Sequence, residues 1–364
     1  LLNSFIVFVI CNIQIFKFEE PLLYIVFILI AIVNWIFFRP KNIDKNDIET
    51  FVKEELILYV FFIVFTYLRG FKPEYYMTEK FMDYGIIMSF LKAKYFPIED
   101  FWGSGNFLNY YYYGQYIMAY FSKFVRLSYG NCYNICVTLM VSLSFMNFYS
   151  LFTNLFSKVS NKLNNIISIF CSTCICFGAN CHYLIYGIIF YLMGDKDYVV
   201  YDSTRYIGFD PVIKTDQTIH EFPSYVFMLG DLHAHAINTF LVACILIILF
   251  TYFLKQRVLS KRNIMSAEII FVGFFLGIFQ SSNYWDFPIY FIVAGTIILF
   301  TNLIVCNSKK EIFKNILITL LQGIIILVLC YITALPFLYN FKMISSKIAP
   351  VDSRSLIYQL FVLW

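Results

Sequence analysis

The chain has 364 residues, of which 60% are hydrophobic, 21% aromatic and only 14% charged. Soluble domains carry about 25% charged residues, and no core could hide this much apolar surface from water, so we predict a multi-pass membrane protein in a lipid bilayer. The formal net charge of +4 is small and indicates no nucleic-acid partner.

Long apolar runs follow one another along the chain, and a helix needs roughly 20 apolar residues to cross a bilayer. We expect helices rather than strands, because a backbone in lipid must satisfy its own hydrogen bonds. The pattern predicts an all-α, polytopic transmembrane helix bundle with about nine spans, at roughly 1–16 (partial), 21–38, 55–70, 132–156, 165–180, 237–254, 267–281, 287–305 and 315–335.

The ends of the chain and its basic residues bear on organisation and orientation. The chain begins with Leu1 and ends at Trp364 inside an apolar run, so we expect residues 1–364 to be a single polytopic domain cut at both ends. Short loops rich in Lys and Arg stay on the cytoplasmic side of a membrane. Four such loops occur, at 39–53, 158–162, 255–262 and 309–314.

This orientation predicts a first large outer loop at 71–131 and a second at 181–236. Residues 114–127 form a short apolar run that Lys123 and Arg126 interrupt, so we expect an interfacial or re-entrant helix there. A further span at that point would reverse the orientation of the loops around it. With the interfacial helix, every polar motif faces outward, and we expect a plasma-membrane protein whose active face is the outer one.

The first polar motif, "MTEKFMDYG", holds Glu79 and Asp83, four residues apart and so on one helix face. Two like charges on one face favour a cation or a shared proton between them. An ordinary solvated helix face, with Lys80 as a neighbour, is the alternative.

The second motif, "FWGSGNFLNYYYYGQY", combines Trp102 and Asn109 with four successive tyrosines at 110–113. Aromatic rings suit sugar faces and lipid chains, and they also form the aromatic belt at membrane interfaces. We take Trp102, Asn109, Tyr110, Tyr111 and Tyr112 as candidate substrate-binding residues.

The third motif, "HEFPSYVFMLGDLHAH", precedes the apolar run 237–254 and contains three of the four histidines. Asp231, His233 and His235 could together hold a divalent cation, or the imidazoles could serve as acid, base or hydrogen-bond donor to phosphate. A helix cap with interfacial histidines is the alternative. Glu221, ten residues before Asp231, is a further ionisable group near the membrane.

Two more stretches contribute candidates. "NYWDFPIY" holds Asn283, Trp285 and Asp286 between two predicted spans, where Asp286 is either a substrate contact or the N-cap of the next helix. "DSTRYIGFDP" in the second outer loop supplies Arg205, a candidate contact for phosphate.

The order of the stretches "TEKFMD", "FPIEDFWGSGNFLNYYYYGQY", "DSTR", "HEFPSYVFMLGDLHAH", "NYWDFPIY" and "LPFLYNF" resembles the YYY membrane-protein family, from about residue 70 to 364. Its members are multi-pass proteins whose shared domain has no established function. They in turn resemble the GT-C superfamily of membrane glycosyltransferases, which implies a GT-C-like bundle whose large outer loop carries short interfacial helices.

The resemblance also implies an activity: transfer of a sugar from a polyprenyl-phosphate donor to an acceptor on the outer face. Glu79 and Asp83 would match the acidic site of such enzymes. Asp231, His233 and His235 match the family stretch "GDLHPH", with Ala234 in place of the common proline and hence a less rigid turn.

In the expected mechanism, Asp83 or Glu79 takes the proton of the acceptor hydroxyl. The leaving phosphate is neutralised by His233, His235, Arg205 or a divalent cation, magnesium or manganese. That cation would be held by Asp231 with the two histidines. The alternatives from other classes are an ion- or solute-transporting protein and a non-catalytic outer-face binding protein.

Overall fold

The computed structural model describes residues 1–37, 43–76, 78–194, 197–214, 217–259, 262–343 and 354–363. Within these ranges the chain is helical and has isolated β-bridges but no strand. The helices are α1 (Leu2–Asn12), α2 (Glu20–Phe37), α3 (Lys45–Gly70), α4 (Lys80–Lys92), α5 (Tyr113–Phe124), α6 (Tyr129–Leu155), α7 (Asn161–Phe177), the π-helix η1 (Tyr183–Ile189), α8 (Phe190–Leu192), the 3₁₀-helix η2 (Val200–Thr204), α9 (Pro223–Leu229), α10 (Ala234–Gln256), α11 (Ala267–Ser282), α12 (Asp286–Leu303), α13 (Lys309–Leu338) and α14 (Ile357–Leu363).

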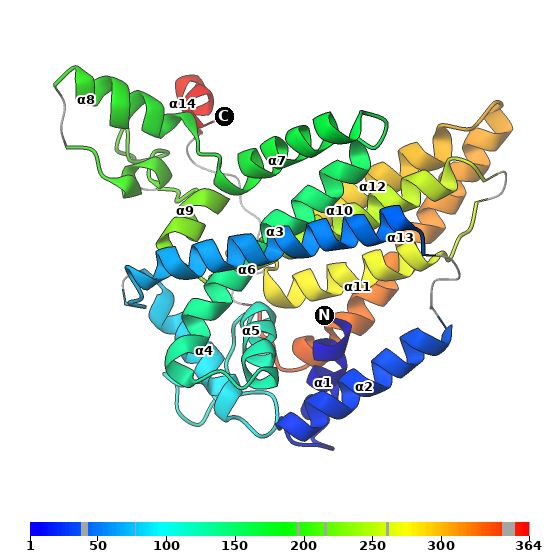
Figure 1. Ribbon diagram of the computed structural model, residues 1–364, viewed down its shortest axis with the longest axis horizontal. Coiled ribbons are helices and arrows are strands. Elements are labelled where there is room, and N and C mark those ends of the chain that lie inside the picture. Colours follow the sequence, from blue (N-terminus) through cyan, green and yellow to red (C-terminus); the bar gives the residue numbers. More distant parts are fainter. Residues whose placement is uncertain are drawn as a thin grey trace.

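The long helices form a bundle in which α3, α6, α10, α11, α12 and α13 run side by side (Figure 1). The short helices α4, α5 and α9 gather at the end of this bundle where α3 ends and α10 begins. The prediction of an all-helical bundle is therefore confirmed. The short helices matter for function because they bring the polar motifs to the start of α10.

Five helices are long and apolar enough to cross a membrane: α2, α6, α10, α12 and α13. The other predicted spans fall on helices that are shorter or more charged. Helix α1 has 11 residues, α11 has 16 and α7 has 17. Helix α3 has 26, but charged side chains extend through its first half to Glu55. Five of the nine predicted spans thus have the required length and composition, and the remaining four stay a prediction.

Helix α5 occupies most of the run 114–127. Its 12 residues extend about 18 Å, which is short of the roughly 30 Å of a bilayer core. It packs against α4, α10 and α11. A short helix in the first predicted outer loop agrees with this geometry, whereas a full span does not.

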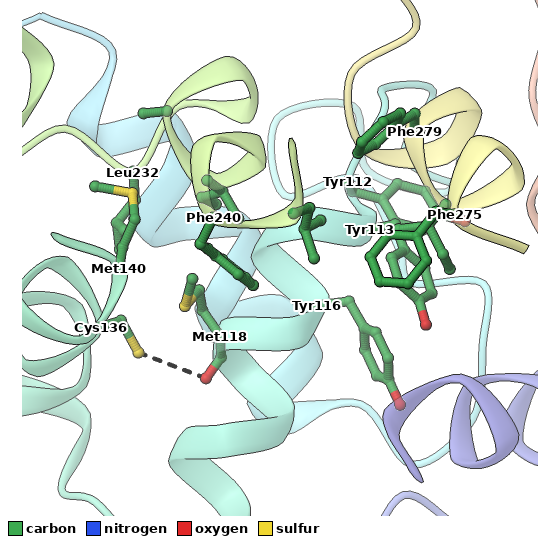
Figure 2. Close-up of a cluster of buried hydrophobic side chains, with 14 of the residues drawn as sticks. Tyr112, Tyr113, Tyr116, Met118, Cys136, Met140, Leu232, Phe240, Phe275 and Phe279 are labelled. Atoms are coloured by element: carbon green, nitrogen blue, oxygen red, sulfur yellow. Dashed lines mark hydrogen bonds between the residues drawn. The ribbon is translucent and has the colours of Figure 1, made fainter. Parts of the chain in front are cut away.

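The core beside α5 is built from aromatic side chains. Tyr112, Tyr113 and Tyr116 are almost fully buried, and Figure 2 shows the first two beside Phe275 and Phe279 of α11. The hydroxyl of Tyr116 donates to the carbonyl of Ser4 in α1, 2.7 Å away. Large rings buried in this way stabilise the junction of α1, α5 and α11, so that α5 becomes a rigid support for the residues that precede it.

Helices α11 and α13 approach each other closely because α11 carries glycines one turn apart. A Cβ at Gly273 would lie 2.7 Å from Leu329, and one at Gly277 would lie 2.5 Å from Thr333. Small residues at this spacing allow close packing between membrane helices, where van der Waals contact is the main source of stability.

Candidate functional site

The "GDLHAH" stretch is a tight turn between α9 and α10. Gly230 caps α9 in the left-handed conformation, with φ of +67°, and the amide of Asp231 donates to the carbonyl of Val226 in a Schellman motif. A Cβ on Gly230 would also lie 2.6 Å from the guanidinium of Arg69. Glycine is thus required here by conformation and by space, and the turn sets His233 as the N-cap of α10.

Two cationic side chains from other helices hold this turn. Nζ of Lys80 donates to the carbonyl of Leu229, 2.6 Å away, and Nη1 of Arg69 lies 3.4 Å from the same oxygen. Arg69 also donates to Asn134 of α6. Arg69 is not among the residues predicted from the sequence, although an arginine at the end of an apolar run is a recognisable signal.

The centre of the site is a contact between Asp83 of α4 and His233. Asp83 is fully buried; its Oδ2 lies 3.4 Å from Nδ1 of His233, and its Oδ1 accepts a 2.8 Å hydrogen bond from Gln115 of α5. The same Nδ1 lies 3.2 Å from Oε2 of Glu79, whose side chain is 63% exposed. One imidazole is therefore placed between a buried carboxylate and an accessible one.

The tyrosine run supplies the other side of His233. The hydroxyl of Tyr110 lies 3.2 Å from Nε2 of His233, and the ring of Tyr111 packs on that of Tyr110 at a centroid distance of 4.3 Å. Burial is the main cause that raises the pKa of Tyr110, so its hydroxyl keeps its proton. Of the predicted contacts, Tyr110 and Tyr111 lie at the site, whereas Tyr112 is part of the aromatic core.

His233 carries a positive charge at neutral pH. Burial alone would lower its pKa, yet contact with Asp83 and the charges of Glu79 and Asp231 outweigh burial and raise the pKa to about 9. Burial raises the pKa of Asp83, and contacts with His233 and Gln115 oppose that rise. Because carboxylate and imidazolium stabilise each other, we place the shared proton on His233.

Asp231 lies beside this pair and is itself almost fully buried. Its Oδ2 accepts a hydrogen bond from the hydroxyl of Thr78, 3.3 Å away, whereas Oδ1 is buried and finds no hydrogen-bond partner in the described part of the chain. Burial and the neighbouring charge of Asp83 raise the pKa of Asp231 to about 6. An unsatisfied buried acceptor in this place is a feature that a bound hydroxyl group or water would complete.

His235 forms a second contact between an imidazole and a carboxylate. Its Nε2 lies 3.1 Å from Oε2 of Glu221, and its ring centroid is 5.3 Å from that of His233. Contact with His235 lowers the pKa of Glu221 although burial opposes it, and the charge of Arg205 contributes in the same direction. Arg205 is thus close to Glu221 but does not contact the pair of Asp83 and His233.

Arg205 instead lines a separate cavity of about 340 Å³. Most of its wall consists of aromatic rings and carboxylates, which are groups that pack on sugar rings and accept from sugar hydroxyls. The full lining is His182, Tyr186, Asp197, Tyr198, Asp202, Arg205, Tyr206, Phe209 and Asp210.

The remaining predicted residues lie apart from the centre of the site. Asp286 begins α12 and accepts from Asn283, 3.0 Å away, and from Asn238 of α10 at 2.7 Å. Asn109 exchanges hydrogen bonds with the backbone of Lys342.

Trp102 and Trp285 are both highly exposed. The ring of Trp102 packs on Phe101, and that of Trp285 lies against Tyr284. Neither tryptophan ring lies against an imidazole of the site within the described part of the chain.

The predicted ligands do not converge on a metal position. A divalent cation would need ligand atoms from several side chains at about 2.0–2.6 Å. Among the residues that the structure describes, no group of three or more His, Cys, Asp or Glu side chains could hold a metal ion. Asp231 faces Thr78, whereas His233 and His235 face carboxylates of their own. We therefore derive no step through magnesium or manganese.

The charge on His233 predicts a pH-dependent stability. Its pKa rises from 6.5 to about 9 on folding, so its contribution to stability is full below about pH 6.5 and is lost as the pH rises through 9. We expect the unfolding temperature of the purified protein to fall across this window. In His233→Gln that decline should disappear, as measured by thermal unfolding from pH 6 to pH 9.5.

His220→Gln is the matched control. Burial lowers the pKa of His220, so its effect belongs below pH 6.5 and the decline above that pH should persist. A decline of equal size in wild type and His233→Gln would contradict the assigned charge.

Comparison with known proteins shows to which family the chain belongs. The model of a family described as "Uncharacterized membrane protein (DUF2298)" matches residues 2–364. No curated protein and no solved structure matches the chain. The expectation of a membrane-protein family without an established activity is thus confirmed over the whole chain.

Proposed function

Because this chain belongs to the DUF2298 family of uncharacterized membrane proteins, we propose an activity from its own site: transfer of a sugar from a polyprenyl-phosphate donor to an acceptor hydroxyl at the outer face of the plasma membrane. The observation that carries the proposal is the position of His233, between the carboxylates of Glu79 and Asp83 and the hydroxyl of Tyr110, at the start of a candidate span. The lipid-linked sugar as donor rests on the resemblance to GT-C enzymes.

The two acids receive different roles because their exposure differs. Glu79 is accessible and takes the proton of the acceptor hydroxyl as its oxygen attacks the anomeric carbon. Asp83 is fully buried and reaches no substrate, so it is a positioning residue that holds His233 in its charged form. The sequence alone left either acid as the base, and the difference in burial favours Glu79.

The leaving group is a lipid phosphate, which gains negative charge as the bond between the anomeric carbon and the phosphate oxygen breaks. The His233 imidazolium stabilises that charge through its field, because its two ring nitrogens already contact Asp83, Glu79 and Tyr110. His233 is also the N-cap of α10, and the positive end of a helix dipole favours an anion. His235 and Arg205 are the further proposed contacts of the phosphate.

The cavity beside Arg205 is the proposed position of the acceptor. Its rings and carboxylates suit a sugar acceptor, and the charge of Arg205 in its wall helps to lower the pKa of Glu221, which contacts His235. The stacked pair of Tyr110 and Tyr111 would contact the donor sugar or the first isoprene unit.

Transport is the weaker alternative. It requires a polar path through the membrane, but between Asn238 and Tyr252 the buried side chains of α10 are apolar. They are Phe240, Leu241, Ala243, Ile245 and Leu249. A non-catalytic binding protein would not need a buried carboxylate to keep an imidazole charged.

The proposed activity is tested by measuring whether the protein consumes a polyprenyl-phosphate sugar donor. Purified protein in nanodiscs is incubated with radiolabelled polyprenyl-phosphate hexoses and a lipid and glycan extract as the source of acceptor. We expect release of polyprenyl phosphate that depends on the extract and declines above about pH 9, as His233 loses its proton. If none of the polyprenyl-phosphate sugars is bound or consumed, the glycosyltransferase proposal is wrong.

A further inference from the structure

A second polar site lies at the opposite end of the bundle, roughly 34 Å away along α10. It is a cavity of about 510 Å³ between the α10–α11 connection and the start of α13. Its lining is both polar and apolar, so the cavity is amphipathic. The polar residues are Arg262, Asn307, Glu311, Lys314 and Asn315, and the apolar ones are Leu259, Ile264, Val305 and Ile318.

The cavity lies at the level where the candidate membrane spans begin and end. The candidate spans α10 and α12 end at Gln256 and Leu303, and α13 begins at Lys309. The lining residues lie in these connections and in the first turns of α13. A ligand in the cavity would have its polar part in the headgroup region and its apolar part against the hydrocarbon core.

The surroundings are strongly cationic. The described residues from the end of α10 to the start of α11 and the first turns of α13 carry six cations and two carboxylates, namely Lys255, Arg257, Arg262, Lys309, Lys310 and Lys314 with Glu268 and Glu311. Glu268 pairs with Lys255 at 2.6 Å, and Glu311 accepts from the backbone amide of Asn307. Both acids thus have partners, and the remaining field favours an anion.

Arg262 has an unused donor. Its Nη1 donates to the carbonyls of Gln256 and Leu259, which fixes the guanidinium, whereas Nη2 is buried and has no hydrogen-bond partner among the described residues. In the part of the chain that the structure describes, neither Arg262 nor Lys314 forms an ion pair. A fixed guanidinium with a free buried N–H is a donor for a phosphate oxygen.

We propose that this cavity binds the phosphate headgroup of an anionic phospholipid, with Arg262 and Lys314 on the phosphate and the acyl chains against Ile264, Val305 and Ile318. Basic pockets between membrane helices bind anionic headgroups in this way. The bilayer supplies the ligand at high local concentration. The site is independent of the acid–histidine site and holds whether or not that site transfers sugars.

The experiment measures lipid binding to the detergent-purified full chain. Dioleoyl phosphatidylglycerol and dioleoyl phosphatidylcholine are titrated, and bound lipid is counted by native mass spectrometry alongside thermal unfolding. We expect phosphatidylglycerol to bind more tightly and to raise the unfolding temperature more. Arg262→Ala combined with Lys314→Ala should weaken phosphatidylglycerol binding about 30-fold and leave phosphatidylcholine binding unchanged.

Two further variants complete the test. Lys158→Ala with Lys162→Ala removes the same charge from an exposed connection and should keep the preference for phosphatidylglycerol. Because Arg262 also holds two carbonyls, its loss is expected to lower stability by itself. Lys314→Glu leaves those bonds in place and should weaken phosphatidylglycerol binding comparably.

Equal binding of the two lipids, or an unchanged preference in Lys314→Glu, would overturn the proposal. So would inorganic phosphate that stabilises the protein equally and displaces phosphatidylglycerol, because the ligand would then be a soluble anion.

Discussion

Asp83→Asn is expected to lower the pKa of His233 from about 9 and to reduce turnover by about 10³–10⁴-fold. Contact with the carboxylate of Asp83 is the largest cause that raises the pKa of this buried imidazole. Without it, the charges of Glu79 and Asp231 alone oppose the effect of burial. The amide of asparagine can still accept from Gln115 while presenting N–H groups to Nδ1 of His233, which favours the wrong tautomer.

The measurement does not depend on a known substrate. The chain has four histidines, so protein labelled with ¹⁵N-histidine gives few imidazole signals to follow by NMR during a pH titration in micelles. Asp100→Asn serves as the control: Asp100 accepts from the amide of Trp102, a bond that asparagine can keep, and it lies outside the site. A His233 pKa that stays near 9 in Asp83→Asn would refute the assigned role of Asp83.

Glu79→Gln is expected to abolish sugar transfer, by about 10²–10⁴-fold in turnover, with little change in stability. Its side chain is 63% exposed, so the substitution disturbs no core contact, but the amide cannot accept the proton of the acceptor hydroxyl. The pKa of His233 should stay raised, because Asp83 remains. Turnover is measured as release of polyprenyl phosphate, and folding as the unfolding temperature.

The two substitutions therefore separate the two roles. Asp83→Asn changes the charge of His233 and the activity together, whereas Glu79→Gln changes activity alone. Glu99→Gln is the matched control, since Glu99 is an exposed carboxylate in the same predicted loop and makes no contact with His233. Wild-type turnover in Glu79→Gln would exclude Glu79 as the base.

The sequence could predict that certain motifs meet, but not how each residue within them is used. "TEKFMD" and "GDLHAH" lie about 150 positions apart and do meet, as Asp83 and His233 do at 3.4 Å. The four successive tyrosines at 110–113 do not all have the same role, and the sequence pattern did not indicate which of them would lie at the site. Tyr110 reaches His233, whereas Tyr112 enters the core, because α5 begins at Tyr113 and ties the last residues of the run to the bundle.

The two acids of the first motif, Glu79 and Asp83, also differ in their roles. In the sequence, Glu79 and Asp83 are two acidic residues four positions apart, and nothing in the pattern distinguishes their roles. Their difference comes from α5 and α10, which cover Asp83 completely and leave the N-cap position of Glu79 open. Burial decides the charge of neighbouring groups and access to substrate, and it depends on the elements packed over a residue.

By itself the sequence determined the helical, membrane-embedded character of the chain. The length and the hydrophobicity of each apolar run are local properties, and they decide whether a helix is stable in a bilayer. The sequence also determined which polar stretches were available to form a site. Only the tertiary structure decided that Asp83 is buried against His233, that Arg69 and Lys80 clamp the turn after α9, and that the predicted metal ligands face separate partners. These outcomes depend on contacts between residues far apart in the chain, and the free energy of such contacts is set by packing that no local pattern encodes.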